Sequence, residues 1–110
     1  MGTTGQPALA EALKLLWVRF LPQMQERVAA LEAANHALQA GVLSGEQRQE
    51  AAAAAHKLAG VLGTFGLITG TELAREAEQI YANEAAIAQT AVVRLSAIAK
   101  TLMTTIQSHS

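Results

Sequence analysis

The sequence predicts an all-α protein, and three observations lead to that prediction. The chain has 110 residues, of which 51% are hydrophobic, and this suits one small domain with a single core. It contains only two prolines and no cysteine, and 4% of its residues are aromatic, which argues against a β-sandwich or a disulfide scaffold. Alanine, leucine, glutamate and glutamine are abundant, and all four favour helices. We therefore expect residues 1–110 to form one domain, an antiparallel up-down four-helix bundle with an extra N-terminal helix.

The first two predicted helices meet at Pro22. Residues 7–21 repeat apolar side chains three or four positions apart, starting with Leu9 and Leu13, and Pro7 suits the first turn of a helix. Proline has no amide donor, so Pro22 should stop or kink this helix. A second helix then continues to just before Gly41, because glycine commonly follows the end of a helix.

The remaining helix boundaries are marked by glycines and by capping residues. Ser44 is a candidate N-cap for the next helix, which Gly66 should end. Thr69 or Thr71 can cap the helix after that break, and Asn83 can cap the last one. The expected helices cover about residues 7–21, 22–40, 46–64, 71–82 and 84–107.

Charge and hydropathy exclude several functional classes. The net charge is −1 and both signs are interspersed, unlike the basic surface of a nucleic-acid-binding protein, so we expect no nucleic-acid partner. No stretch approaches the roughly 20 uncharged apolar residues that cross a bilayer, and the first residues lack the pattern of a signal peptide. A chain without cysteine fits a reducing compartment. These observations predict a cytoplasmic protein without a membrane partner.

The helix expected over residues 46–64 carries His56 on the side opposite to its apolar side chains. At about 100° per residue, the apolar residues fall roughly 180° to 260° away from His56. The residues within roughly 60° of it are small or polar, so His56 should stand alone on a flat, solvent-facing surface. The expected core side consists of Ala51, Ala55, Leu58, Leu62 and Phe65, and the expected exposed side consists of Gln49, Ala52, Ala53, Gly60 and Gly63.

Gly60 and Gly63 require an explanation, because a glycine inside a helix costs about 1 kcal/mol relative to alanine. On the solvent side they would make room for no helix of the same bundle, so we infer that they let another molecule approach His56. Imidazole is largely neutral at pH 7, and an exposed ring then has a nitrogen lone pair that can act as a nucleophile. A phosphoryl group on that nitrogen would add negative charge, which Lys57 could partly offset.

The stretch HKLAGVLGTFG, residues 56–66, resembles the signature of histidine-containing phosphotransfer domains. That signature has an apolar residue two positions after the histidine and glycines four and ten positions after it, here Leu58, Gly60 and Gly66. The segment GTFG at 63–66 is similar to the corresponding segment of the phosphotransfer domain of chemotaxis histidine kinases. The segment LAREAEQI is similar to the next helix of the family, so the resemblance covers most of the chain.

The resemblance implies that His56 accepts a phosphoryl group from one partner and exchanges it with the aspartate of a response-regulator receiver domain. The expected partners are a receiver domain, a hybrid histidine kinase or both, and a monomer is expected. In this family the domain is a phosphocarrier and not an enzyme, and the receiver brings the magnesium, so no cofactor or metal is expected on this chain. Many members have a lysine three positions after the histidine, where this chain has Ala59, and Lys57 is the candidate replacement. The expected docking surface comprises Gln49, Ala52, Ala53, Lys57, Ala59, Gly60 and Gly63.

Three other functions are weighed against this interpretation. A helical docking module without phosphotransfer would use the alanines of residues 51–55 and the glycines, but docking alone needs no nucleophile. A zinc site built from His36, His56 and His109 would lack the usual ligand spacing, and His36 and His109 are expected to be ordinary surface residues. An enzyme with its own active site would need a nucleotide motif or a second catalytic group near His56, and the sequence shows neither.

Overall fold

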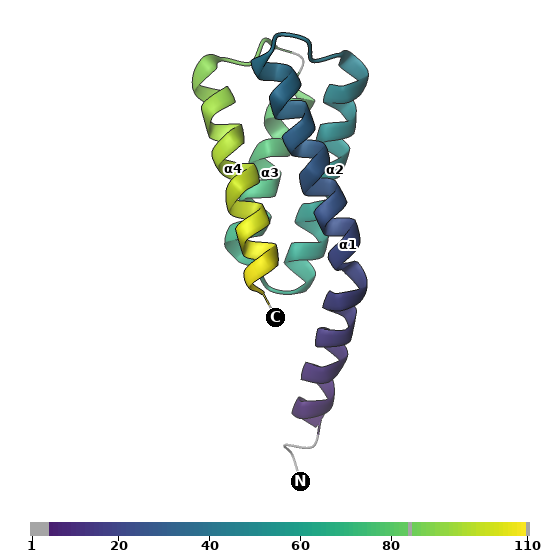
Figure 1. Ribbon diagram of the computed structural model, residues 1–110. Coiled ribbons are helices and arrows are strands. Elements are labelled where there is room, and N and C mark those ends of the chain that lie inside the picture. The colour runs from purple at the N-terminus through teal and green to yellow at the C-terminus, as the bar shows by residue number, and fades with distance from the viewer. Residues whose placement is uncertain (1–4, 84, 110) are drawn as a thin grey trace.

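The computed structural model describes residues 5–83 and 85–109, with side chains described from Ala8 onward. These residues form four helices, α1 (Gly5–Gln39), α2 (Gly45–Thr64), α3 (Ile68–Ala82) and α4 (Gln89–Ser108). Figure 1 shows that the helices pack side by side and that consecutive helices run in opposite directions. The predicted all-α class is confirmed. Within the described residues, no helix combines the length and the apolar character needed to cross a membrane.

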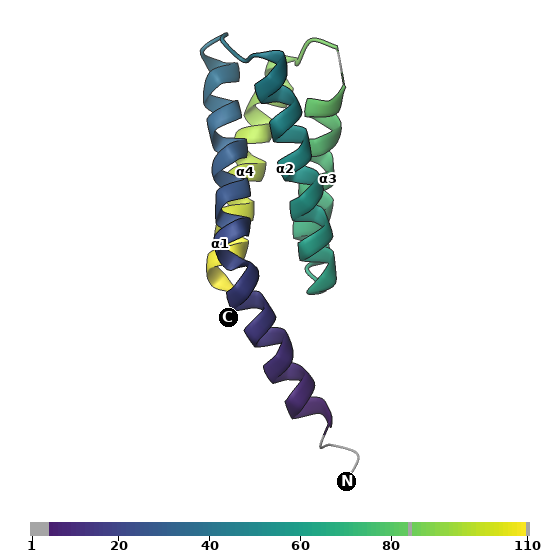
Figure 2. The ribbon, with the colours of Figure 1, turned by 90° about the vertical axis from the view of Figure 1, so that its right-hand side faces the viewer.

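The two helices predicted at the N-terminus are one helix, so the prediction of a separate N-terminal helix is wrong. α1 is a continuous helix of 35 residues that contains Pro22. Trp17 before the proline and Met24 after it are 4% and 0% exposed. Because both turns are anchored in the same core, the helix tolerates the missing hydrogen bond and does not end. Figure 2 shows that α1 bends where it leaves the bundle and projects beyond it.

Helices α1 and α2 end in the same way, at a glycine in the left-handed region. Gly41 has a φ of 73° and Gly66 a φ of 71°. The residue that follows each glycine donates its amide to a carbonyl five residues earlier, at 2.8 and 3.0 Å respectively. This is the Schellman arrangement, in which a left-handed glycine lets the chain satisfy the last carbonyls of the helix. The prediction that Gly66 ends the helix is confirmed.

The predicted helix caps were correct only at Ser44. Its hydroxyl oxygen accepts a hydrogen bond from the Gln47 amide at 3.0 Å at the start of α2. Thr69 and Thr71 are not caps, because α3 begins at Ile68 and both threonines lie inside it. Thr71 is buried and donates its hydroxyl to the Leu67 carbonyl at 2.9 Å. Leu67, the residue before α3, packs against the core.

Asn83 was also predicted as a cap, and that prediction is wrong. It follows the end of α3, and its side chain accepts a hydrogen bond from the Ala85 amide at 3.1 Å. α4 begins only at Gln89, and Arg48 of α2 contacts the chain before it. Arg48 donates hydrogen bonds to the carbonyls of Tyr81 and Ala85, each at 2.8 Å. A contact across 37 positions of sequence therefore anchors Ala85, just before α4.

The core lies between the four helices and is mostly aliphatic, with one buried polar network. The Tyr81 hydroxyl donates to the side-chain oxygen of Asn35, and the Asn35 amide donates to the Leu95 carbonyl at 3.1 Å. These contacts join α1, α3 and α4. The predicted core side of α2 is confirmed for its four aliphatic members, while Phe65 is half-buried against the core. The four are Ala51, Ala55, Leu58 and Leu62.

Candidate functional site

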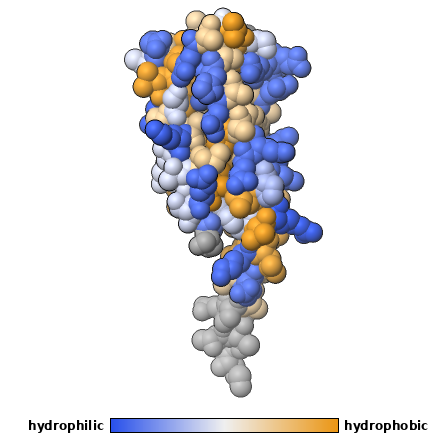
Figure 3. All heavy atoms as spheres, in the orientation of Figure 1, coloured by the Kyte–Doolittle hydropathy of each residue, from blue (hydrophilic) through white to orange (hydrophobic). Residues whose placement is uncertain are grey.

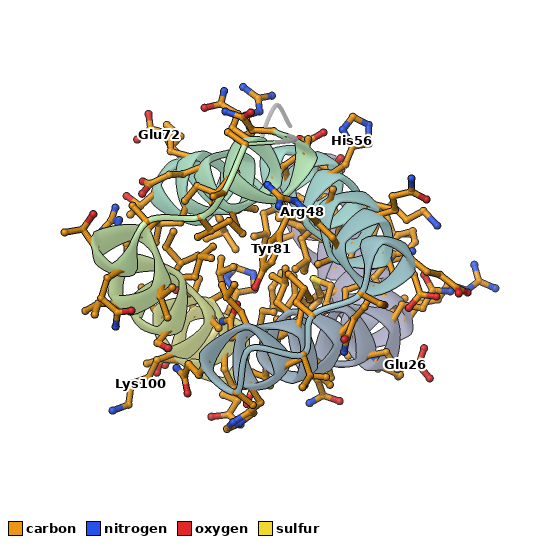
Figure 4. The ribbon with its side chains drawn as sticks, turned by 90° about the horizontal axis from the view of Figure 1, so that it is seen from above. Glu26, Arg48, His56, Glu72, Tyr81 and Lys100 are labelled. Carbon is orange, nitrogen blue, oxygen red and sulfur yellow. The ribbon has the colours of Figure 1, made fainter. Side chains whose placement is uncertain are left out.

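His56 lies in the second half of α2 and points away from the core. Its side chain is 74% exposed, whereas Leu58 and Leu62 on the other side of the helix are 0% exposed. Figure 4 shows the contrast with Tyr81, which points into the interior. The predicted separation between the histidine and the apolar face of this helix is therefore confirmed.

The imidazole of His56 is held by a carboxylate from the neighbouring helix. Its Nδ1 atom lies 2.9 Å from Oε2 of Glu78, on α3. A carboxylate accepts hydrogen bonds, so Nδ1 is the donor and carries the ring proton. In the neutral ring the lone pair is then on Nε2. The contact fixes the ring orientation and leaves one nitrogen free to react.

Sequence reasoning missed Glu78, and the cause is its distance along the chain. It is 22 residues from His56, and only the packing of α2 against α3 brings the two side chains together. α3 also carries Glu72 and Glu76. The helical pattern alone does not show which of the three glutamates lies next to His56.

Two hollows follow the seam between α2 and α3. The first, of about 300 Å³, is lined by His56, Ala59, Gly60, Arg75, Glu78 and Gln79. The second, of about 430 Å³, is lined by Gly45, Arg48, Gln49, Ala52, Tyr81 and Ala82. Both are open to solvent, and α2 and α3 each contribute to both. His56 therefore stands beside a groove and not on a flat surface.

The glycines of α2 and α3 differ in what surrounds them. A Cβ atom at Gly60 would have nothing within 4 Å, whereas one at Gly70 would lie 3.2 Å from Cδ1 of Leu62. Gly70 thus permits close helix packing, and Gly60 does not serve that purpose. A Cβ at Gly63 would lie 3.7 Å from the Thr71 hydroxyl, which is ordinary contact. The expectation that no helix lies near the glycines holds for Gly60 and is wrong for Gly63.

Most residues of the predicted docking surface are exposed, but two are not. Ala59 is only 4% exposed, and Ala52 is half-buried against the core. Both are turned towards α3, which covers them, so the prediction that they lie on the open face is corrected. Each forms part of the wall of a hollow. The exposed members are Gln49, Ala53, Lys57, Gly60 and Gly63.

An ion pair on the other side of α3 engages a second glutamate. Arg94 of α4 donates to the two carboxylate oxygens of Glu76 at 2.6 and 2.8 Å. The hydrogen bond from Arg94 holds the pKa of Glu76 below its ordinary value, with a smaller contribution from the positive charge. Glu76 is therefore committed to the α3–α4 contact.

The three histidines have different environments. His36 is exposed on α1, as predicted. His109 is half-buried, with its ring centroid 4.1 Å from that of Trp17, so the expectation of an ordinary surface residue is wrong there. Trp17 offers an aromatic face at the end of the bundle, and His109 covers it. Among the described residues, no three His, Cys, Asp or Glu side chains lie close enough to share a metal ion.

Comparison with known proteins identifies the family. The family model described as "Hpt domain" matches residues 15–108. The chain is similar to protein RcaC of Microchaete diplosiphon, with 39% identity over 62 residues, which are 56% of this chain and 10% of RcaC. The chain thus spans about a tenth of the length of that relative. No solved structure was found to match it. The chain belongs to the Hpt domain family, whose members carry phosphohistidine in two-component phosphorelays and have receiver domains and kinases as partners.

Proposed function

We propose that His56 is the phosphoacceptor of this Hpt domain and that Nε2 is the reacting atom. The observation that carries the proposal is the 2.9 Å contact between Nδ1 and Glu78 on a side chain that is 74% exposed. The contact places the proton on the nitrogen that faces α3 and leaves the other nitrogen accessible to a partner. A histidine held in one tautomer by a hydrogen bond to its second nitrogen is the usual arrangement for a reacting imidazole.

The transfer then needs no further reacting group from this chain. The Nε2 lone pair attacks phosphorus, and the bond between phosphorus and the donor atom breaks. The ring now holds both the Nδ1 proton and the phosphoryl group, so it is positively charged, and the Glu78 carboxylate faces that charge. In the second step an aspartate oxygen of the receiver attacks phosphorus, the N–P bond breaks, and its electron pair returns to Nε2.

The groove between α2 and α3 is the proposed docking surface. Its walls come from α2 and α3, which both pack against the shared core. Gly60 lies beside His56 and has open space around it, so the backbone of a partner can approach closely there. We place Gln49, Ala53, Lys57 and Gly63 on the surface around the groove, with Ala52 and Ala59 in its walls.

The domain is proposed to act as a phosphocarrier without its own nucleotide or metal site. When a receiver is bound, its magnesium would supply charge neutralisation at the phosphoryl group. We further propose that the protein is a cytoplasmic monomer. We also propose that it binds no nucleic acid, because its net charge is only −1 and charges of both signs are interspersed.

The test is phosphorylation of the purified domain by radiolabelled phosphoramidate, followed by addition of a receiver domain. We expect an acid-labile label on the wild type that moves to the receiver. His56→Gln should take up no label and should remain folded, because it loses only one exposed hydrogen bond.

The matched control is His36→Gln, which removes another exposed histidine. This variant should be labelled at the wild-type rate. Label that persists in His56→Gln would disprove the assignment, and loss of label in both variants would indicate that the histidines act indirectly.

A further inference from the structure

The contact that orients His56 also creates an electrostatic difficulty. A phosphoryl group carries negative charge, and the Glu78 carboxylate lies 2.9 Å from the ring that must accept it. Glu78 therefore makes the approach to His56 from α3 acidic. A nearby cation would offset this repulsion in both the uptake and the release of the phosphoryl group.

Arg75 is the cation that the fold brings to this place. It lies on α3 one turn before Glu78, and it lines the same hollow of about 300 Å³ as His56 and Gly60. Among the described residues, the ion pairs are His56–Glu78 and Glu76–Arg94, so the Arg75 guanidinium is not committed to a carboxylate. A guanidinium presents several N–H donors in a plane and suits the oxygens of a phosphoryl group.

Lys57 is the alternative, and the geometry favours Arg75. Lys57 is exposed and adjacent to His56 in sequence, but it is turned by roughly 100° around the helix. α3 contacts the opposite flank of His56, where Ala59 lines the hollow. Lys57 therefore lies on the far side of His56 from Glu78, whereas Arg75 lies on the same side.

We propose that Arg75 binds the phosphoryl group at His56 and replaces the lysine that stands three positions after the histidine in many Hpt domains. This inference rests on the proposed function of His56. In the phosphorylated state the guanidinium donates hydrogen bonds to phosphoryl oxygens from across the hollow. Ala59, which occupies the position of that lysine, is buried in the wall of the same hollow, so the charge comes from α3 instead.

The experiment compares Arg75→Gln, Arg75→Lys, Lys57→Gln and Arg19→Gln as phosphoramidate acceptors over a range of donor concentrations. Arg19 is an exposed arginine on α1 and provides the control with the same loss of charge. We expect Arg75→Gln to lower kcat/KM about three- to tenfold, mainly through KM, because an exposed charge-assisted contact to the donor is lost. Arg75→Lys should recover most of the rate, and Arg19→Gln should stay within about twofold of wild type. Lys57→Gln should lose less than Arg75→Gln.

A spectroscopic measurement separates binding from a structural effect. In ¹⁵N–¹H spectra of the wild type, the Nε–H resonance of Arg75 should move on phosphorylation, and that of Arg19 should not. A wild type that takes no label at His56 overturns the proposed function and this inference together. A labelled wild type in which Arg75→Gln matches Arg19→Gln, or in which Lys57→Gln shows the larger loss, overturns only the role of Arg75.

Discussion

At the scale of single residues, Tyr81 shows how burial changes ionisation. Its side chain is 1% exposed, and burial raises its pKa to about 12, although the positive charge of Arg48 acts in the opposite direction. The unfolded chain would release the same proton near pH 10. Between pH 10 and 12 the unfolded state therefore loses a proton that the folded state keeps, and folding stability falls with rising pH.

We expect this effect to lower the free energy of unfolding by about 2 to 3 kcal/mol between pH 10 and pH 12. Urea unfolding at a series of pH values measures it, and Tyr81→Phe is the control. The phenylalanine variant should be less stable at pH 7, because Asn35 loses its buried partner, and its stability should decline less above pH 10. Parallel declines in both proteins would contradict the assignment. Tyr81 is the only tyrosine, so ultraviolet absorbance follows its ionisation directly.

Gly60 offers a second test at this scale, because stability and function should change in opposite directions. Gly60→Ala should raise the free energy of unfolding by about 0.5 to 1 kcal/mol, because alanine has a higher helix propensity than glycine. The added methyl group meets no atom within 4 Å. The added methyl group should slow phosphoryl transfer to a receiver and leave the reaction with phosphoramidate unchanged. Transfer at the wild-type rate would remove Gly60 from the docking surface.

Gly66→Ala is the matched control for Gly60→Ala. Gly66 has a φ of 71°, which is unfavourable for alanine, so the substitution should destabilise the domain by about 1 to 2 kcal/mol. The folded variant should transfer phosphoryl groups at the normal rate, because Gly66 lies after the end of α2 and lines neither hollow next to the α2–α3 seam.

At the scale of elements, the helix ends show which signals are local. Ser44 and Gly66 act through hydrogen bonds within a few residues of themselves, so their roles could be predicted from sequence. Leu67, before α3, packs against the core, and Ala85, before α4, accepts a hydrogen bond from Arg48 of another helix. Contacts with other helices cannot be predicted from the neighbouring residues in sequence. The cap predictions at Thr69, Thr71 and Asn83 used only those neighbours, and they were wrong.

Pro22 is the clearest case of packing that overrides a local preference, and it leads to a prediction. Its side chain is exposed, so Pro22→Ala removes no core contact and restores one amide donor inside α1. We expect the free energy of unfolding to rise by about 1 to 3 kcal/mol. Thermal or urea unfolding measures it, with Gln23→Ala as the exposed neighbouring control. A loss of stability would mean that the bend in α1 is itself required.

At the scale of the whole molecule, α1 has two parts with different surroundings. The part inside the bundle buries Met24, Val28 and Leu31, and the part before Trp17 leaves large apolar side chains in solvent. Figure 3 shows hydrophobic side chains gathered on this projecting end. Leu9 is 60% and Leu15 69% exposed there. The family match begins at residue 15, so most of the projecting part lies outside it.

The sequence by itself determined the helical class, the glycine helix ends and the side of α2 that carries His56. These features follow from repeats and hydrogen bonds within one helix, where positions three and four residues apart share a face. Only the tertiary structure decided the environment of the histidine. Glu78 and Arg75 reach the same hollow because α3 packs against α2, and the choice among the charged residues of α3 depends on which face that packing presents. A single helix does not encode that choice, since the rotation and height of α3 are set by the shared core of all four helices.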